Sequence, residues 1–301
     1  MDSLPPINVH LTIGAVEIGV LVSYTLFGVT TVQAYIYYGR FPDDPSKLKA
    51  LVALVWFCLL AQVIAIGHIL YTFTITYFGQ AFRIFETAPK SLSVGVFSGG
   101  IMAAAVQGFF AYRIYAFTKK LYIPILSWSL SFVRFLGSVT IFATTLRMTS
   151  FPTYAEQWGW LLTSVWCISA ANDLTITASL VTNLIIQRSR IHKRTVPLID
   201  KLIMWTIETG MVTSLTALAV MISFFTMPHN FIWFCLFISL PGLFSNSLLA
   251  SLNSRTTLRA MNNLNSGSVP ISTTLNFGTE LPSAPRESAE QNPKRGAHYA
   301  T

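Results

Sequence analysis

Seven stretches of predominantly apolar residues, each 23 to 27 residues long, follow one another along the chain and are separated by short polar or charged segments. A bilayer core is about 30 Å thick and a helix rises about 1.5 Å per residue, so roughly 20 apolar residues suffice to cross it. The pattern predicts an all-α, polytopic membrane bundle of seven transmembrane helices. The predicted spans are Leu11–Tyr37, Leu48–Thr74, Leu92–Phe117, Leu121–Leu146, Leu161–Ile186, Leu202–Met227 and Phe231–Asn253.

The predicted seven-helix domain covers residues 11–253. It is preceded by a short segment and followed by a polar one. Residues 1–10 carry no basic region or small-residue cleavage site, which predicts a short outer amino terminus and a retained first helix. Residues 254–301 are rich in Ser, Thr, Asn and Pro and contain few large apolar residues, which predicts a disordered cytosolic tail.

Composition and charge agree with a membrane protein and indicate its orientation. Hydrophobic residues make up 52% of the chain and charged residues 11%, whereas soluble domains contain about 25% charged residues. The net charge of +8 is concentrated on one side of the predicted membrane, which argues against nucleic acid as a partner. Thirteen basic residues share that side: Arg40, Lys47, Lys49, Arg113, Lys119, Lys120, Arg188, Arg190, Lys193, Arg194, Lys201, Arg255 and Arg259. Only Arg83, Lys90 and Arg147 lie opposite, so we expect an outer amino terminus and a cytosolic carboxyl terminus.

Two charged residues fall near the middle of consecutive spans. Placing Arg or Asp at the bilayer centre costs about 2.5 to 3.5 kcal/mol, so such residues need partners. We therefore predict that Arg134 and Asp173 form an ion pair. The pair could serve only to orient two helices, or it could line a functional polar cavity, and the sequence favours neither.

Four further intramembrane polar residues are candidates for a site. Glu17 and His68 come to similar depth on the first two spans, where a carboxylate and an imidazole could form a proton-sensitive pair. Glu208 follows Lys201 by seven residues on nearly the same helix face, so charge pairing on the cytosolic side is its simpler interpretation. Asn246 aligns with a polar face of the last span.

Catalytic and cofactor motifs are lacking in the sequence. Phosphate-binding glycine loops, nucleophile elbows and paired metal-binding histidines do not occur, and the last span has no lysine for a retinal Schiff base. We expect no cofactor, no metal and no enzymatic activity. A membrane-embedded hydrolase using His10, His68, His229 and Glu17 remains a remote alternative.

Several motifs resemble one known family. They are Gly28-Val-Thr-Thr-Val-Gln33, the Tyr-Tyr-Gly-Arg-Phe-Pro-Asp-Asp run after the first span, Asp173-Leu-Thr-Ile-Thr-Ala-Ser-Leu, Thr206-Ile-Glu-Thr-Gly-Met-Val-Thr-Ser, and Ser245-Asn-Ser-Leu-Leu-Ala-Ser-Leu-Asn-Ser-Arg255. The chain up to Arg255, most strongly from Asp173 onward, resembles a large seven-helix membrane family of unknown function from mushroom-forming (basidiomycete) fungi. This resemblance implies a fungal integral membrane protein and supplies no substrate, cofactor or catalytic residue. Glu208 stands where relatives are expected to carry an uncharged residue.

Two functions fit these features. The first is a receptor-like sensor in the plasma membrane or an endomembrane, with anionic lipid at its cytosolic face and a signalling partner at residues 187–201 and the tail. The alternative is a secondary transporter or proton-coupled carrier that uses Arg134 and Asp173, with Pro241 expected to break the last helix. The oligomeric state is not determined by the sequence.

Overall fold

The fold is that of a computed structural model, which describes residues 9–80, 83–86, 89–148, 150–188, 196–227 and 230–265. All regular elements in these residues are helices. They are α1 (Ala15–Arg40), α2 (Ser46–Tyr71), the one-turn α3 (Arg83–Glu86), α4 (Ser91–Thr118), α5 (Tyr122–Thr145), α6 (Phe151–Arg188), α7 (Val196–Thr226) and α8 (Ile232–Asn265). Short π-helical turns, His10–Gly14 and Thr72–Thr76, extend α1 at its start and α2 at its end.

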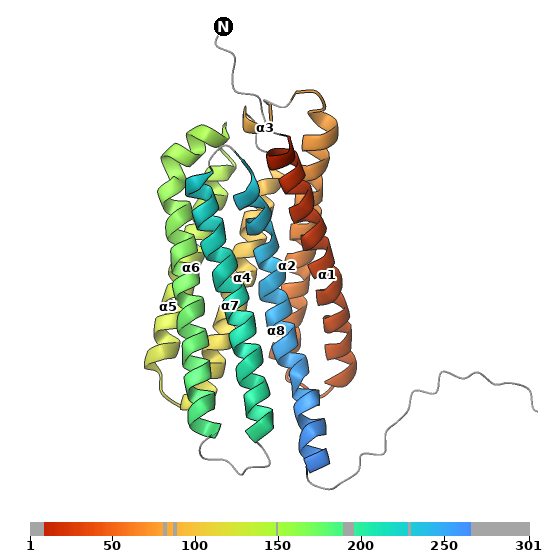
Figure 1. The fold of residues 1–301 in the computed structure, drawn as a ribbon, viewed down its shortest axis with the longest axis vertical. Coiled ribbons are helices and arrows are strands. Elements are labelled where there is room, and N and C mark those ends of the chain that lie inside the picture. Colours follow the sequence, from red (N-terminus) through yellow and green to blue (C-terminus); the bar gives the residue numbers. More distant parts are fainter. Residues whose placement is uncertain are drawn as a thin grey trace, which may run out of the picture.

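The seven long helices form a closed ring in which each helix packs against the next in the chain and α8 returns to α1. Figure 1 shows them running side by side along the long axis of the bundle. We call the end where α1 begins the N-side and the end where α8 finishes the C-side. Of the most apolar 18 residues of α8, 56% are buried, which is the highest share among the helices that could cross a membrane. This is because α8 also contacts α2 and α4 across the ring.

Six of the seven long helices are long and apolar enough to cross a membrane, by length and composition. The protein is accordingly a multi-pass integral membrane protein. The helix that falls short is α6, whose 38 residues include Asn172 and Asp173. It starts ten residues before the predicted fifth span, and α8 continues to Asn265, beyond the residue where we expected the tail to begin. The tail from residue 266 onward lies outside the described residues.

The expectation that Pro241 breaks the last helix is wrong, because α8 runs through it without interruption. Proline removes one backbone hydrogen bond, and in a membrane protein such a site persists where neighbouring helices supply other partners. The carbonyl of Ile238, three residues before Pro241, accepts hydrogen bonds from Ser23 Oγ at 3.0 Å and from Gln62 Nε2 at 3.5 Å. Side chains from α1 and α2 thus support the backbone beside the proline.

A series of polar contacts along the whole interface joins α8 to α1. Thr30 Oγ1 and Ser245 Oγ are 3.0 Å apart, and two asparagine side chains of α8 donate to carbonyls of α1. Asn246 donates to Leu26 O at 3.1 Å, and Asn253 donates to Gln33 O at 2.9 Å. Because both asparagines and both carbonyls are seven residues apart, the contact repeats after two helical turns.

At the C-side an ion pair connects the end of α8 to the turn between α1 and α2. The guanidinium of Arg255 donates to both carboxylate oxygens of Asp44, at 2.6 and 3.2 Å. Tyr37 Oη donates to the same carboxylate at 2.9 Å, and the guanidinium lies 4.2 Å from the ring centroid of Phe41. We call these four residues the Asp44–Arg255 lock. They belong to two of the motifs on which the family resemblance rests.

Candidate ligand-binding site

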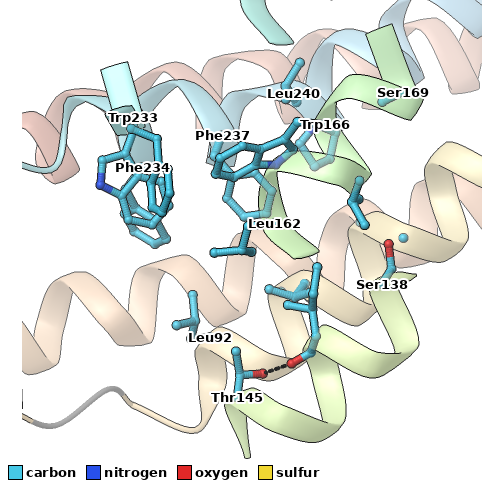
Figure 2. Close-up of a pocket in the computed structure, with 18 of the residues that line it drawn as sticks. Leu92, Ser138, Thr145, Leu162, Trp166, Ser169, Trp233, Phe234, Phe237 and Leu240 are labelled. Carbon is cyan, nitrogen blue, oxygen red and sulfur yellow. Dashed lines mark hydrogen bonds between the residues drawn. The ribbon is translucent and has the colours of Figure 1, made fainter. Parts of the chain in front are cut away.

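A cavity of about 90 Å³ lies in the N-side half of the bundle, between α4, α5, α6, α7 and α8. We call it the N-side cavity. Figure 2 shows the rings of Trp166, Trp233, Phe234 and Phe237 gathered around it, together with Leu92 and Leu162. Most of the lining is apolar and aromatic, with a few polar groups among them, which is the composition of pockets that bind small molecules.

The aromatic residues of the cavity contact one another and form a continuous wall. Trp166 of α6 lies edge-on to Phe224 of α7, with ring centroids 5.4 Å apart, and Phe224 lies edge-on to Trp233 of α8 at 5.3 Å. Phe237 of α8 is 6.1 Å from Trp166. Edge-on packing at these distances is favourable for aromatic pairs. The wall is therefore a continuous aromatic surface built from three helices.

Arg134 of α5 supplies the positive charge of the N-side cavity. Its guanidinium carbon lies 5.6 Å from the ring centroid of Phe244, which also lines the cavity. The Nε and Nη1 atoms of Arg134 are buried and have no hydrogen-bond partner among the described residues. A buried guanidinium with unused donors favours an anionic group beside it.

A chain of buried polar side chains joins α6, α4 and α5 next to Arg134. Gln107 Nε2 donates to Asp173 Oδ1 at 2.7 Å, and Ser131 Oγ donates to Gln107 Oε1 at 3.1 Å. Asn172 Nδ2 donates to Ser131 Oγ at 2.9 Å, while Ser127 Oγ donates to Asn172 Oδ1 at 2.8 Å. Each of these residues is at most 6% exposed. Such a connected network fixes the relative register of three helices.

The predicted ion pair between Arg134 and Asp173 is not formed. The structure contains no N···O contact within 4.0 Å between them, although the two charges still attract each other at longer range. Asp173 Oδ1 is held by Gln107, Oδ2 has no partner in the described part of the chain, and Arg134 lies against Phe244 instead. Gln107 of α4 thus takes the place that was predicted for Arg134 beside Asp173, and Phe244 of α8 is the neighbour of Arg134.

Arg134 and Asp173 border different cavities. Asp173 lines a small cavity of about 30 Å³, the Asp173 cavity, and Phe244 lines both this cavity and the N-side cavity. Phe244 therefore separates the space beside Arg134 from the space beside Asp173.

The suggested meeting of Glu17 and His68 is also not formed. Both residues are exposed on the outside of the bundle, and His68 Nδ1 is 3.0 Å from Ser91 Oγ at the start of α4. No ion pair joins them. Helical rotation explains the difference, because equal depth on two helices does not imply that two side chains face each other.

Glu208 and Asn246 line a larger hollow of about 680 Å³ in the C-side half, between α1, α7 and α8. We call it the C-side groove. Glu208 is exposed, and the ion pairs of the described residues do not include it, while the Lys201 ammonium lies 5.0 Å from the ring centroid of Trp205. The expected charge pairing of Glu208 is thus not observed. Asn246 primarily joins α8 to α1, which is a structural role.

The histidines do not assemble into a metal-binding group within the described residues. His229 lies outside those residues, and no group of three or more His, Cys, Asp or Glu side chains in the described part could hold a metal ion. The hydrolase alternative built on His10, His68, His229 and Glu17 stays untested.

The sequence did not identify several residues of these sites. Gln107, an amide in the middle of an apolar span, was a usable signal, since a buried amide needs partners. The partners themselves, and the pairing of Asp44 with Arg255 across 211 residues, depend on how the ring closes. The aromatic wall had no signal, because aromatic residues occur throughout the spans.

Residues 169–257 match the model of a protein family described as a family of unknown function, DUF6534. No curated protein and no solved structure matches the chain. The matched segment contains Asp173, Glu208 and Asn246 and ends just after Arg255. Over this segment the chain is thus similar to a family of unknown function, within a multi-pass helical membrane protein.

Proposed function

We propose that the protein is a receptor-like sensor that binds a small aromatic or apolar anion in the N-side cavity and reports binding at the C-side. In this proposal all seven long helices cross the membrane, with the N-side outside and the C-side in the cytosol. The position of α6 in the ring, packed between α5 and α7, supports its crossing, and the thirteen-to-three distribution of basic residues supports the orientation. The proposed membrane is the plasma membrane or an endomembrane.

The proposed ligand class follows from the lining of the cavity. An apolar ring fits against Trp166, Phe224 and Trp233, and an anionic group fits the unused Nε and Nη1 donors of Arg134. A guanidinium and a carboxylate form strong charge-assisted hydrogen bonds, and these are stronger away from water.

One observation carries the sensor proposal: α8 lines the cavity at one end and forms the Asp44–Arg255 lock at the other. Trp233, Phe237 and Phe244 of α8 line the cavity, and Arg255 lies further along the same uninterrupted helix. A ligand that shifts α8 therefore acts directly on the contact between α8 and the α1–α2 turn. The proposed output surfaces are residues 187–201 and the tail, where a cytosolic partner would bind.

The test uses benzoate as an aromatic anion and benzamide as its neutral counterpart. Purified full-length protein should gain thermal stability with benzoate and less with benzamide, because only the carboxylate uses Arg134. Arg134→Gln should abolish the difference between the two probes. Arg83→Gln, which removes an exposed N-side charge outside the cavity, should keep it.

The reporting step is measured by hydrogen exchange of the α1–α2 turn and the end of α8. Benzoate should change exchange there in the wild type and in Arg83→Gln, and should leave Arg134→Gln unchanged. If benzoate binds with no effect at the C-side, the cavity is a ligand site and the sensor proposal fails.

A transporter is the second candidate, and the position of Phe244 supports it. The Asp173 cavity shares Phe110, Thr206, Thr209, Thr213 and Ser247 with the C-side groove. Phe244 then stands between a cavity at the N-side and a series of cavities leading to the C-side. Benzoate uptake into proteoliposomes that is lost with Asp173→Asn would favour this alternative over the sensor, whereas binding without uptake would exclude benzoate transport.

A further inference from the structure

The C-side groove is a second site, separate from the N-side cavity. Its floor is α8, with Asn246, Ser247 and Ser251, and its walls are α1 and α7. Phe110 and Arg113 of α4 also line it. The lining residues Val29, Val212 and Ala250 are exposed on the outside of the bundle, so the groove opens outward, where the membrane surrounds the bundle. A molecule could enter it sideways from the bilayer.

The groove has an apolar part and a cationic part. Leu26, Val29, Val212 and Leu243 line it toward the middle of the bundle. Arg40, the last residue of α1, and Arg113, five residues before the end of α4, line it toward the C-side. Since five residues of helix span about 8 Å, Arg113 lies within reach of the headgroup level of the bilayer. This gradient matches a lipid aligned with the helices.

Arg113 has partners that leave its charge uncompensated. Its Nη1 donates to Ser251 Oγ at 2.6 Å, and its guanidinium lies 5.6 Å from the ring centroid of Phe117. No carboxylate of the described residues lies within 4.0 Å of it. A partly buried arginine whose hydrogen-bond partner among the described residues is a hydroxyl retains donors for an anion.

The remaining charges around the groove also favour an anion. Lys201 lies over the ring of Trp205, which lines the groove. Together with Arg40 and Arg113, Lys201 makes three cations at or near the groove. Glu208 is the single carboxylate among the lining residues, and Asp200 is already paired with Arg188 at 2.7 Å.

We infer that the C-side groove binds a membrane phospholipid, with the headgroup phosphate on Arg113 and an acyl chain along Leu26, Val29 and Val212. The inference concerns a lipid site and does not depend on a ligand in the N-side cavity. The groove volume of about 680 Å³ accommodates a headgroup and part of one chain.

The experiment is native mass spectrometry of the full-length protein with three probes: short-chain phosphatidic acid, the matching diacylglycerol and inorganic phosphate. The wild type should retain phosphatidic acid, and Arg113→Gln should bind it about tenfold more weakly or worse, because a charge-assisted contact is lost. Lys120→Gln removes an exposed charge at the same end of the bundle outside the groove and should bind like the wild type.

A second variant keeps the test decisive if Arg113→Gln fails to fold. Ala250 is exposed and lines the groove, so Ala250→Trp should fill it and displace the lipid while Arg113 remains. Equal retention of phosphatidic acid by the wild type and Ala250→Trp would overturn the inference. Retention of diacylglycerol as strong as that of phosphatidic acid would refute the role of the phosphate, and equally strong binding of inorganic phosphate would refute the lipid.

Discussion

At the scale of residues, three arginines at the bundle interior differ in what surrounds their charge. Arg255 has a carboxylate in a two-point contact, Arg113 has a hydroxyl and Arg134 has an aromatic ring. Since an intramembrane charge is costly, the arginines without a carboxylate are the candidates for binding an anion, and Arg255 is the candidate for holding the fold.

The first prediction concerns the Asp44–Arg255 lock. A double-mutant cycle of Asp44→Ala and Arg255→Ala should show a coupling free energy of about 1 to 3 kcal/mol, because the contact is two-pointed and partly buried. The matched control is the exposed pair of Arg188 and Asp200, whose coupling should be below about 1 kcal/mol. Thermal or denaturant unfolding of the purified variants measures both coupling free energies. Equal coupling in the two pairs would contradict the role of Arg255 in holding the fold.

A second prediction at this scale concerns Arg134 and Asp173. Because they share no direct contact, Arg134→Gln and Asp173→Asn should give nearly additive changes in unfolding free energy, with a coupling below about 1 kcal/mol from the remaining long-range attraction. By contrast Gln107→Ala combined with Asp173→Asn should be strongly non-additive, since the 2.7 Å hydrogen bond joins them. A large coupling between Arg134 and Asp173 would restore the ion pair that the sequence predicted.

At the scale of helices, close packing depends on a few positions without a side chain. A Cβ at Gly210 of α7 would lie 2.0 Å from Thr177 Oγ1 and 2.9 Å from Thr177 Cβ on α6, so the two helices touch there. The threonines along this part of α7 bond to their own helix: Thr209 donates to Trp205 O and Thr213 to Thr209 O. Close approach at Gly210, rather than hydroxyl bonds between helices, therefore accounts for the contact.

The third prediction tests this interface. Gly210→Ala should lower the unfolding free energy by about 1 to 3 kcal/mol, because the added methyl group cannot be placed without moving α6 or α7. Gly28→Ala is the control within α1: a Cβ there meets nothing within 4 Å, and alanine should be neutral or stabilising by up to about 1 kcal/mol. An unchanged unfolding free energy of Gly210→Ala would show that α6 and α7 can move apart at little cost to accommodate the methyl group.

At the scale of the whole molecule, the ring order follows the chain and α8 closes it by packing against both α7 and α1. It contributes to the N-side cavity, the C-side groove and the Asp44–Arg255 lock. The orientation of this ring in the membrane is a separate property, set by the charges of the connecting segments.

The fourth prediction concerns that orientation. The chain contains no Asn-x-Ser/Thr site, so engineered sites report without background. A flanked site inserted after Gly79, an exposed turn residue between α2 and α4, should be glycosylated, whereas one inserted after Lys119, between α4 and α5, should not. A third insertion after Ser189, following α6, should also stay unmodified if α6 crosses. Modification after Lys119 alone would reverse the orientation, and modification after both Gly79 and Ser189 would mean that α6 does not cross.

What the sequence by itself determined is the part of the structure that depends on local composition. Apolar length identified the helices to within a few residues at most ends, and short connections made consecutive helices neighbours, because both depend only on residues close in the chain. It also singled out Arg134 and Asp173 as charged residues within apolar spans, since intramembrane charge is rare and costly.

Only the tertiary structure decided which of these groups meet. Helical rotation turned Glu17 and His68 outward, and the closure of α8 on α1 brought Arg255 to Asp44 and separated Arg134 from Asp173 by Phe244. The structure also keeps α8 continuous through Pro241, where Ser23 of α1 and Gln62 of α2 donate to the neighbouring Ile238 carbonyl. These outcomes depend on the rotation and contacts of helices distant in sequence, for which depth along a single span contains no information.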